Sequence, residues 1–361
     1  MINTLRASIE EFCLTPGLSG HEHRIRKVIE THLAPLSCDT DRLGNLWTTF
    51  EGDEDAPTVL LFAHMDQLGF VVRKIEDNGF MRLEPVGRVP ERVLPSQAVI
   101  FCTKNGDIPG VIGHRSRHET GVDGDYSVTR FNDLFVDAGF TSNLSAGAAG
   151  ITIGTPVVYR PEFMRMQGAR VAGTAIDGRA CCAALVALAE RLTHRDSGPT
   201  IHLAFTTQDQ MNLRGVLPLV NWLTPDIAIQ VDQMLSSDIP GMQDVGDMHL
   251  GKGPAMSLYS FEKSGTMNGV IPHPALVDLF EASAKAVRTN LQRSAQPGQL
   301  TGSSFVQFQG DGVACLDIGF PMRYSHSSLE VCDLDDIASL IEVLNAALMR
   351  IDRSFNITSG R

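Results

Sequence analysis

The sequence predicts an α/β fold in which a small β-barrel domain interrupts a larger domain. An apolar run over residues 58–62 is typical of a buried strand, and it ends in polar residues. From about residue 68 to 166 the pattern changes to short strand-like runs separated by Gly, Asn and Pro. Beyond residue 167 helix and strand patterns alternate again. The predicted domains are therefore 1–67 together with 167–361, and the inserted β-domain 68–166.

Composition excludes several classes of protein. The 361 residues are 43% hydrophobic and 20% charged, which is ordinary for a globular enzyme. A net charge of −12 disfavours nucleic acid and anionic membranes as partners. No apolar run approaches the roughly 20 residues that span a bilayer, and the polar, helical pattern of residues 1–13 predicts no signal peptide. Seven cysteines without paired spacing favour a reducing cytoplasm.

The first segment predicts two helices and two strands. Helix-period apolar positions fill residues 2–14, and the breaker 15–20 separates them from a second helix at about 21–33. Strand signals follow at 46–50 and 58–62. The insertion then shows five short strand-like runs that indicate a barrel or sandwich, at 70–75, 80–83, 98–101, 110–113 and 156–159.

The last part of the chain predicts helices over 179–192, 213–223, 275–291 and 333–351. Strands are expected at 200–206 and 227–231. Two polar, Gly-containing stretches, 236–247 and 293–304, are expected to be loops.

Potential metal ligands follow several of the predicted strands. Because the carboxyl ends of strands in α/β proteins collect ligands, side chains from distant segments can meet there. Imidazole nitrogen and carboxylate oxygen suit zinc or cobalt, and two such metals need a bridging carboxylate. The candidates are His64 and Asp66 after the strand at 58–62, Asp177, Asp209 with Gln210, Asp232, and His326.

Each candidate alone also has a structural explanation. A single histidine at a strand end is more often a hydrogen-bonded structural residue. Asp177, followed by Gly178, could be a turn former or helix cap, and Asp209 could simply close a strand. The order of the candidates along the chain, and the segments around them, favour the interpretation that they form one metal site together.

The chain resembles the tetrahedral, dinuclear-metal aminopeptidases, a family of glutamyl and deblocking aminopeptidases of which some members are labelled endoglucanases. The similarity covers nearly the whole chain. The matching segments are Leu18-Ser19-Gly20-His21-Glu22, residues 63–70, 80–87, 110–113, 133–137, 154–158, 208–215 and 251–254, and Arg323-Tyr324-Ser325-His326-Ser327.

The resemblance implies a zinc-aminopeptidase-like catalytic domain with an inserted β-barrel that builds dodecamers from dimers. It also implies a role for each candidate. His64 and Asp232 would hold one zinc or cobalt ion, Asp177 would bridge to a second, and His326 would serve that second ion. Asp66 would support His64, and Asp209 stands where the family has its glutamate base.

Three positions depart from the family pattern. Asp209-Gln210 replaces two consecutive glutamates, Asp177-Gly178-Arg179 replaces Asp-Asp-Arg, and Thr301-Gly302-Ser303 stands where an acidic residue is usual. The carboxamide of Gln210 brings no charge to balance a divalent ion, so it is a weak ligand. We therefore expect one strong metal site and a weak or empty second one.

Three functions remain open at this point. The resemblance favours a metal-dependent aminopeptidase that uses metal-activated water on peptide substrates. The replaced glutamate pair also fits a catalytically weakened paralogue that binds peptides or acts as a scaffold oligomer. A hydrolase for a glycan or an acylated amino acid is the third, although no carboxylate pair here marks a glycosidase.

Overall fold

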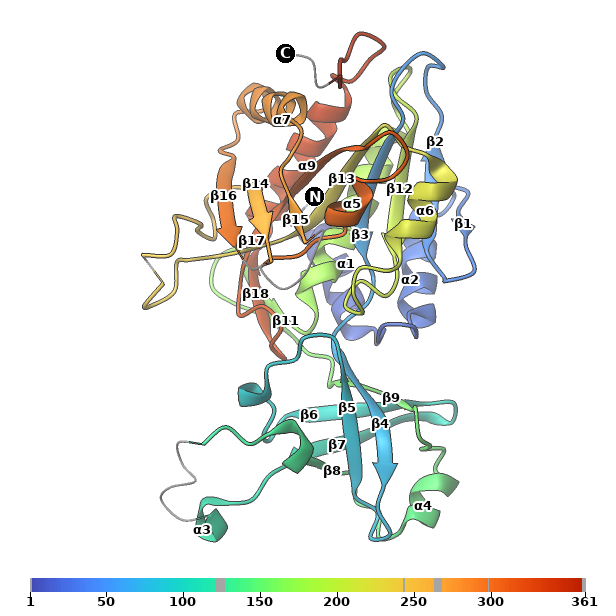
Figure 1. Cartoon of the computed structure of the whole chain (residues 1–361), viewed down its shortest axis with the longest axis vertical. Coiled ribbons are helices and arrows are strands. Elements are labelled where there is room, and N and C mark those ends of the chain that lie inside the picture. The colour runs from blue at the N-terminus through green and yellow to red at the C-terminus, as the bar shows by residue number, and fades with distance from the viewer. Residues whose placement is uncertain (1, 121–126, 243, 263–267, 298, 359–361) are drawn as a thin grey trace.

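The computed structural model describes residues 2–120, 127–242, 244–262, 268–297 and 299–358. It consists of a large layered α/β part and a small β-barrel below it (Figure 1). The predicted fold class is confirmed. Among the described residues, no helix is long and apolar enough to cross a bilayer.

Four neighbouring strands form the centre of the large sheet. Strand β3 (Val59–His64) lies between β12 (Ile201–Thr206) and β13 (Ile227–Leu235), and β13 continues to β17 (Ala314–Arg323). All three of these pairs are parallel. Parallel strands are covered by helices on both faces, and accordingly β3, β12 and most of β13 and β17 are buried.

Alternate side chains of β3 enter two different cores. Leu61 and its odd-numbered neighbours pack against one group of helices, while Leu60 and Phe62 pack against the other. The first group consists of α1 (Ile2–Leu14), α2 (His23–Leu33), α5 (Ile176–Leu192), α7 (Pro274–Ala286) and α9 (Leu334–Leu348). The second consists of α6 (Val216–Leu223) and α8 (Ser303–Val306).

Shorter strands complete the large sheet on both sides. β2 (Leu46–Phe50) pairs antiparallel with β12, and β1 (Asp39–Thr40) pairs with β2. On the other side lie β18 (Glu330–Asp333), β11 (Arg170–Gly173) and β10 (Phe163–Arg165). A further group next to β17 consists of β14 (Ala255–Phe261), β15 (Gly269–Val270) and β16 (Gln292–Pro297).

Six strands close the barrel, in the order β4, β5, β8, β7, β6 and β9. Their bounds are β4 (Gly69–Ile75), β5 (Met81–Val86), β6 (Ala98–Thr103), β7 (Gly106–Gly113), β8 (Phe135–Asp137) and β9 (Pro156–Tyr159), with the short helices α3 (Arg117–Thr120) and α4 (Asn143–Ala148) outside. Phe70, Phe101 and Val136 fill the interior, as expected of a small barrel. Closure removes the open sheet edges that the insertion would otherwise expose.

The barrel is joined to the large part by an apolar contact and an ion pair. Leu18 from the N-terminal segment packs against Val86 and Val158 of the barrel. Arg24 of α2 forms two hydrogen bonds, 2.9 and 3.0 Å long, with the carboxylate of Asp107 in β7. The domain limits 1–67, 167–361 and 68–166 stay a prediction.

Several element predictions were wrong in detail. The helix expected over 275–291 ends at Ala286, because Arg288 adopts a left-handed backbone with φ of 57°. Part of the loop expected at 293–304 is instead strand β16, paired with β14. Two residues of the expected loops, 243 and 298, lie outside the described residues.

One central strand was missed altogether. Strand β17 pairs with β13 over nine positions, but Gly319 and Pro321 interrupt its apolar pattern. Such residues normally indicate a turn. Partnership with β13, rather than local pattern, decides the structure of this segment.

Candidate metal centre

The predicted ligands meet at the carboxyl ends of the parallel strands. His64 is the last residue of β3, Asp232 lies in the second half of β13, and Asp177 stands in the first turn of α5. This edge of an open α/β sheet is where ligand sites form.

These three side chains form a compact ligand set. Each offers one ligand atom, and the three atoms lie within 4.8 Å of one another. Nε2 of His64 is 3.6 Å from Oδ1 of Asp177. One imidazole nitrogen and two carboxylate oxygens are a donor set that zinc accepts, with room for a fourth ligand. The residues present therefore fit a divalent metal.

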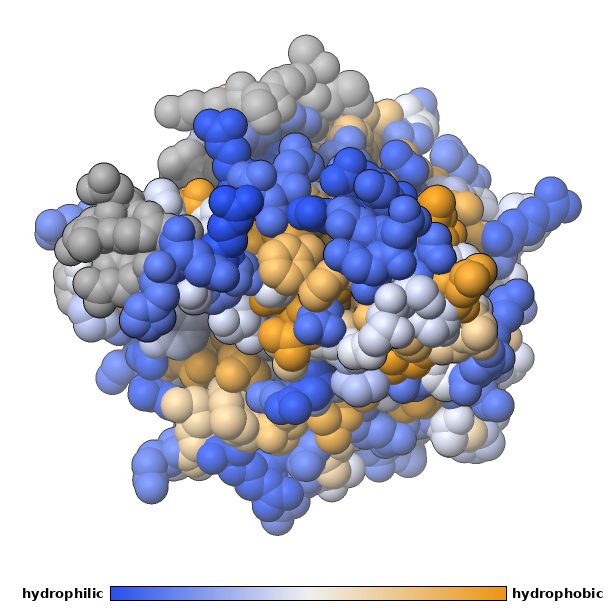
Figure 2. Space-filling view, turned by 90° about the horizontal axis from the view of Figure 1, so that it is seen from below, coloured by the Kyte–Doolittle hydropathy of each residue, from blue (hydrophilic) through white to orange (hydrophobic). Residues whose placement is uncertain are grey.

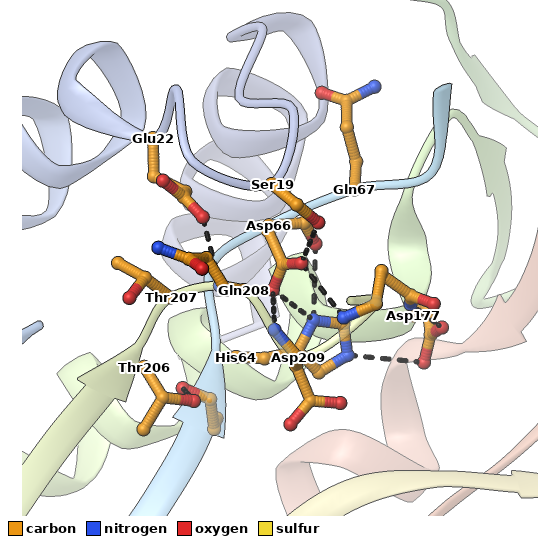
Figure 3. A network of polar contacts seen from close by, with 12 residues as sticks. Ser19, Glu22, His64, Asp66, Gln67, Asp177, Thr206, Thr207, Gln208 and Asp209 are labelled. Carbon is orange, nitrogen blue, oxygen red and sulfur yellow. Dashed lines mark hydrogen bonds and ion pairs between the residues drawn. The ribbon is translucent and has the colours of Figure 1, made fainter. Parts of the chain in front are cut away.

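Asp66 contacts the His64 ring through two of its oxygen atoms. Nδ1 of His64 lies 3.1 Å from the main-chain oxygen of Asp66 and 3.5 Å from its Oδ1 (Figure 3). A proton on Nδ1 satisfies these acceptors and leaves Nε2 with its lone pair toward the carboxylates.

Asp66 also holds the segment that carries Asp209. Oδ1 of Asp66 accepts a hydrogen bond of 3.0 Å from the main-chain N–H of Asp209, and Oδ2 accepts one of 2.9 Å from that of Gln210. Ser19 donates its hydroxyl to the same carboxylate. One step earlier, the N–H of Gln208, whose φ is 54°, donates to Glu22 at 2.9 Å (Figure 3). These bonds fix the main chain directly beneath the Asp209 side chain.

The environment of Asp209 suits proton transfer. Burial raises the pKa of its carboxyl to about 7, and the neighbouring carboxylates of Asp66 and Asp177 contribute to the rise. A group with a pKa near neutral can accept and release a proton at physiological pH.

The two carboxylate oxygens of Asp177 have different neighbours. Its Oδ1 faces His64, whereas its Oδ2 lies 3.9 Å from Nε2 of His326 and accepts a hydrogen bond of 3.2 Å from Nε2 of Gln210. Nδ1 of His326 lies 3.2 Å from the main-chain oxygen of Arg88. The structure thus brings His326 and Gln210 to the far side of Asp177 from His64.

Asp232 is held in place from its own strand. Gln230 donates to its Oδ2 at 3.0 Å, and the main-chain N–H of Gln233 donates to its Oδ1 at 2.7 Å. Burial raises the pKa of Asp232 well above its usual range, and the charge of Asp177 raises it further. A cation between these two carboxylates would remove that penalty.

A cleft of about 430 Å³ leads to the site. Its walls include the three ligand residues, the link to the barrel with Arg88 and Pro90, and the segment Gln299–Thr301. The segments that carry Asp209 and His326 also line it.

Thr301 begins the segment in which the resemblance leads us to expect an acidic residue, and it lines the cleft. Thr301 donates its hydroxyl to Oδ2 of the buried Asp317 at 2.7 Å, and the N–H of Ser303 donates to Oε1 of Gln230 at 3.1 Å. The segment 301–303 therefore binds side chains of β13 and β17, and it offers no carboxylate to a metal.

Sequence reasoning missed two buried glutamates beside the site, Glu22 and Glu330. Glu22 lies in one of the segments that resemble the family, and Glu330 lies in none of them. Burial and the charge of Asp177 raise the pKa of Glu330, whereas hydrogen bonds from the main-chain N–H groups of Asp177 and His326 favour its ionised form. The signal in the sequence that could have indicated Glu330 is an acidic residue next to the apolar pair Val331-Cys332, where a buried strand would otherwise be expected.

The chain is similar to known aminopeptidases over most of its length. A family model described as M42 glutamyl aminopeptidase matches residues 44–343. A lysyl aminopeptidase of Pyrococcus furiosus is 29% identical over 344 residues, covering 92% of this chain and 94% of the relative.

Two solved structures share the fold. The aminopeptidase APDkam598 of the archaeon Desulfurococcus kamchatkensis superposes with a TM-score of 0.91 at 26% identity, covering 98% of this chain and 97% of that one. The TET1 peptidase of Pyrococcus horikoshii gives a TM-score of 0.85 at 27% identity, covering 96% and 100%.

Gly178 provides a test of how closely the His64 ring must sit on helix α5. A Cβ at position 178 would lie 2.3 Å from the main-chain oxygen of His64 and 2.6 Å from its ring. Gly178→Ala should therefore cost about 1–3 kcal/mol of stability and weaken cobalt binding about tenfold or more. Thermal unfolding and Co²⁺ titration measure both quantities.

Gly147→Ala is the matched control, because a Cβ there meets no atom within 4 Å. It should leave cobalt affinity unchanged. If Gly178→Ala binds cobalt as tightly as the unmodified chain does, the close contact between His64 and α5 is not needed for metal binding.

Proposed function

The chain belongs to the M42 glutamyl aminopeptidase family, and we propose that it hydrolyses N-terminal residues from peptides with a divalent metal held by His64, Asp177 and Asp232. The observation that carries this proposal is the convergence of these three ligand atoms from separate segments. Relatives that match nearly the whole chain are aminopeptidases, and the chain is a hydrolase of this type. The scaffold alternative gains no support from them.

The side chains divide the chemistry between them. When bound, the metal supplies Lewis-acid polarisation of the scissile carbonyl and lowers the pKa of water. Asp209 lines the cleft beside the ligands and accepts a proton from the attacking water, then delivers it to the leaving amine. Asp66 contributes by holding His64 and the main chain of Asp209 in place.

The charge distribution of the cleft favours an exopeptidase. The metal would balance the charges of Asp177 and Asp232, which leaves Asp209 as the acidic group of the cavity that all three line. A free α-amino group, whose pKa is about 8, carries the positive charge that this acidic group attracts. A peptide then enters with its N-terminus toward the ligands and its scissile carbonyl nearby.

We propose one strong metal site and a weak second one. The side-chain amide of Gln210 donates a hydrogen bond to Asp177. As a metal ligand it would have to present its oxygen instead. On that side of Asp177 only His326 remains as a strong ligand. Zinc and cobalt are the metals proposed, since the donors are imidazole and carboxylate.

Asp209→Asn tests the base. The amide has the same shape but cannot accept the proton, so turnover of amino-acid arylamides should fall about 10²–10⁴-fold. Metal content should be unchanged, because Asp209 is not among the three ligands. A chelator should abolish turnover of the unmodified chain, and zinc or cobalt should restore it.

Asp209→Glu is the control that keeps a carboxylate, and it should retain turnover. An Asp209→Asn variant as fast as the unmodified chain would contradict the assignment of the base. An unmodified chain that turns over no arylamide or short peptide would contradict the proposed function itself.

Gln210→Glu tests the metal count. The unmodified chain should retain about one tightly held ion after dialysis, and the variant should retain more because a carboxylate replaces the neutral amide. Plasma mass spectrometry measures the metal-to-protein ratio. Two tightly held ions in the unmodified chain would show that Gln210 does not weaken the second site.

We further propose that the chain forms a cytoplasmic homo-oligomer, in which dimers assemble into a dodecamer through the insertion 68–166. The TET1 peptidase assembles into a tetrahedron or a large octahedral shell. On the barrel part, Leu144 and Ile153 are 82% and 74% exposed. Figure 2, seen from the barrel end, shows hydrophobic residues gathered across the middle of this face. All seven cysteines are free thiols, which suits a reducing compartment.

Light scattering on the unmodified chain tests the assembly. A single large species is expected, and the double substitution Leu144→Glu with Ile153→Glu should reduce its mass, because charge in an apolar contact is costly. The control, Trp222→Glu, changes an exposed apolar residue on α6, outside the barrel. A monomeric unmodified chain would contradict the proposal.

A further inference from the structure

A single buried carboxylate joins two segments of the metal centre. Glu330, in β18, is 2% exposed. Its Oε2 accepts a hydrogen bond of 2.9 Å from the main-chain N–H of Asp177, and its Oε1 accepts one of 2.8 Å from that of His326. Each oxygen of the carboxylate thus binds the backbone of a different residue whose side chain faces the metal centre.

Both bound segments have unusual backbone conformations. His326 has φ of 65°, and Ala175, two residues before Asp177, has φ of 58°. For residues other than glycine, this left-handed region costs on the order of 1 kcal/mol and persists only where surrounding contacts enforce it. The hydrogen bonds to Glu330 are contacts of this kind at both places.

The side chains of the two bound residues face each other. Oδ2 of Asp177 lies 3.9 Å from Nε2 of His326. Asp177 lies at the start of α5, and His326 lies in the turn after β17, so the two residues belong to different elements. Glu330 lies in β18, which pairs with β17 and with β11, the strand that precedes α5.

We propose that Glu330 is a positioning residue of the metal centre: its carboxylate sets the separation of Asp177 and His326 by binding both of their main-chain N–H groups. This inference rests on the proposed function only in that Asp177 ligates a metal. The role requires two acceptor oxygens. Glutamine offers one acceptor and would turn an NH₂ group toward the other N–H, while aspartate is one methylene too short to reach both donors.

The chain contains a matched control for loss of a buried, doubly bonded carboxylate. Asp336 of α9 is 1% exposed and accepts hydrogen bonds of 2.7 Å from the main-chain N–H groups of Gly251 and Gly253. It touches none of the predicted ligands through these bonds. Asp336→Asn should therefore lower stability as Glu330→Gln does, without changing the metal centre.

The experiment compares Co²⁺ binding in the full-length chain and in Glu330→Gln, Glu330→Asp and Asp336→Asn. Both Glu330 variants should bind Co²⁺ about 10–100-fold more weakly, and their visible absorption spectra should change because the ligand geometry changes. Asp336→Asn should keep the affinity and spectrum of the unmodified chain. Thermal unfolding of each variant measures the loss of stability, separately from metal binding.

Three outcomes would overturn the proposal. The first is unchanged cobalt affinity and spectrum in a folded Glu330→Gln protein. The second is normal binding by Glu330→Asp with weak binding by Glu330→Gln, since the charge, and not the placement, would then matter. The third is an equal loss of affinity in Asp336→Asn. If Glu330→Gln does not fold, Glu330→Asp supplies the same measurement. Because cobalt binding needs no substrate, failure of the peptidase assay on the unmodified chain would leave this test intact.

Discussion

The site depends on the electrostatic conflict among carboxylates brought together at one end of a parallel sheet. Asp177, Asp209 and Asp232 share one cleft with His64, and burial raises the pKa of Asp209 and Asp232. Buried like charges are costly unless a counter-charge lies between them. A divalent cation within the proposed ligand set would supply that charge, so the arrangement has a physical reason to bind metal.

Around the ligands, other acidic side chains bind main-chain donors. Asp66 accepts from the N–H groups of Asp209 and Gln210, Glu22 from that of Gln208, and Glu330 from those of Asp177 and His326. Charge-assisted hydrogen bonds of this type are among the stronger ones, and they act on the backbone rather than on the ligand atoms. They explain how short loops hold the functional side chains in fixed positions.

The sequence predicted the features that follow from local pattern. The run at 58–62 and its terminal His64 were evident because a buried strand between two helical layers is continuously apolar. Strand β17 was missed because Gly319 and Pro321 break its pattern and only pairing with β13 reveals it. Glu330 was missed because its role is to bind the backbone of residues distant in the chain. The ligand candidates were identified from their positions after apolar runs, but their roles came from resemblance to a family, since spacing alone could not show that His326 would lie beside Asp177.

The most direct test is to locate the bound ion. A crystal of the unmodified chain soaked in zinc should show a strong anomalous peak within bonding distance of His64, Asp177 and Asp232, with little or none between Gln210 and His326. A peak elsewhere in the molecule, or no peak beside His64 at saturating zinc, would contradict the claim that these buried acids and this imidazole are assembled around a cation.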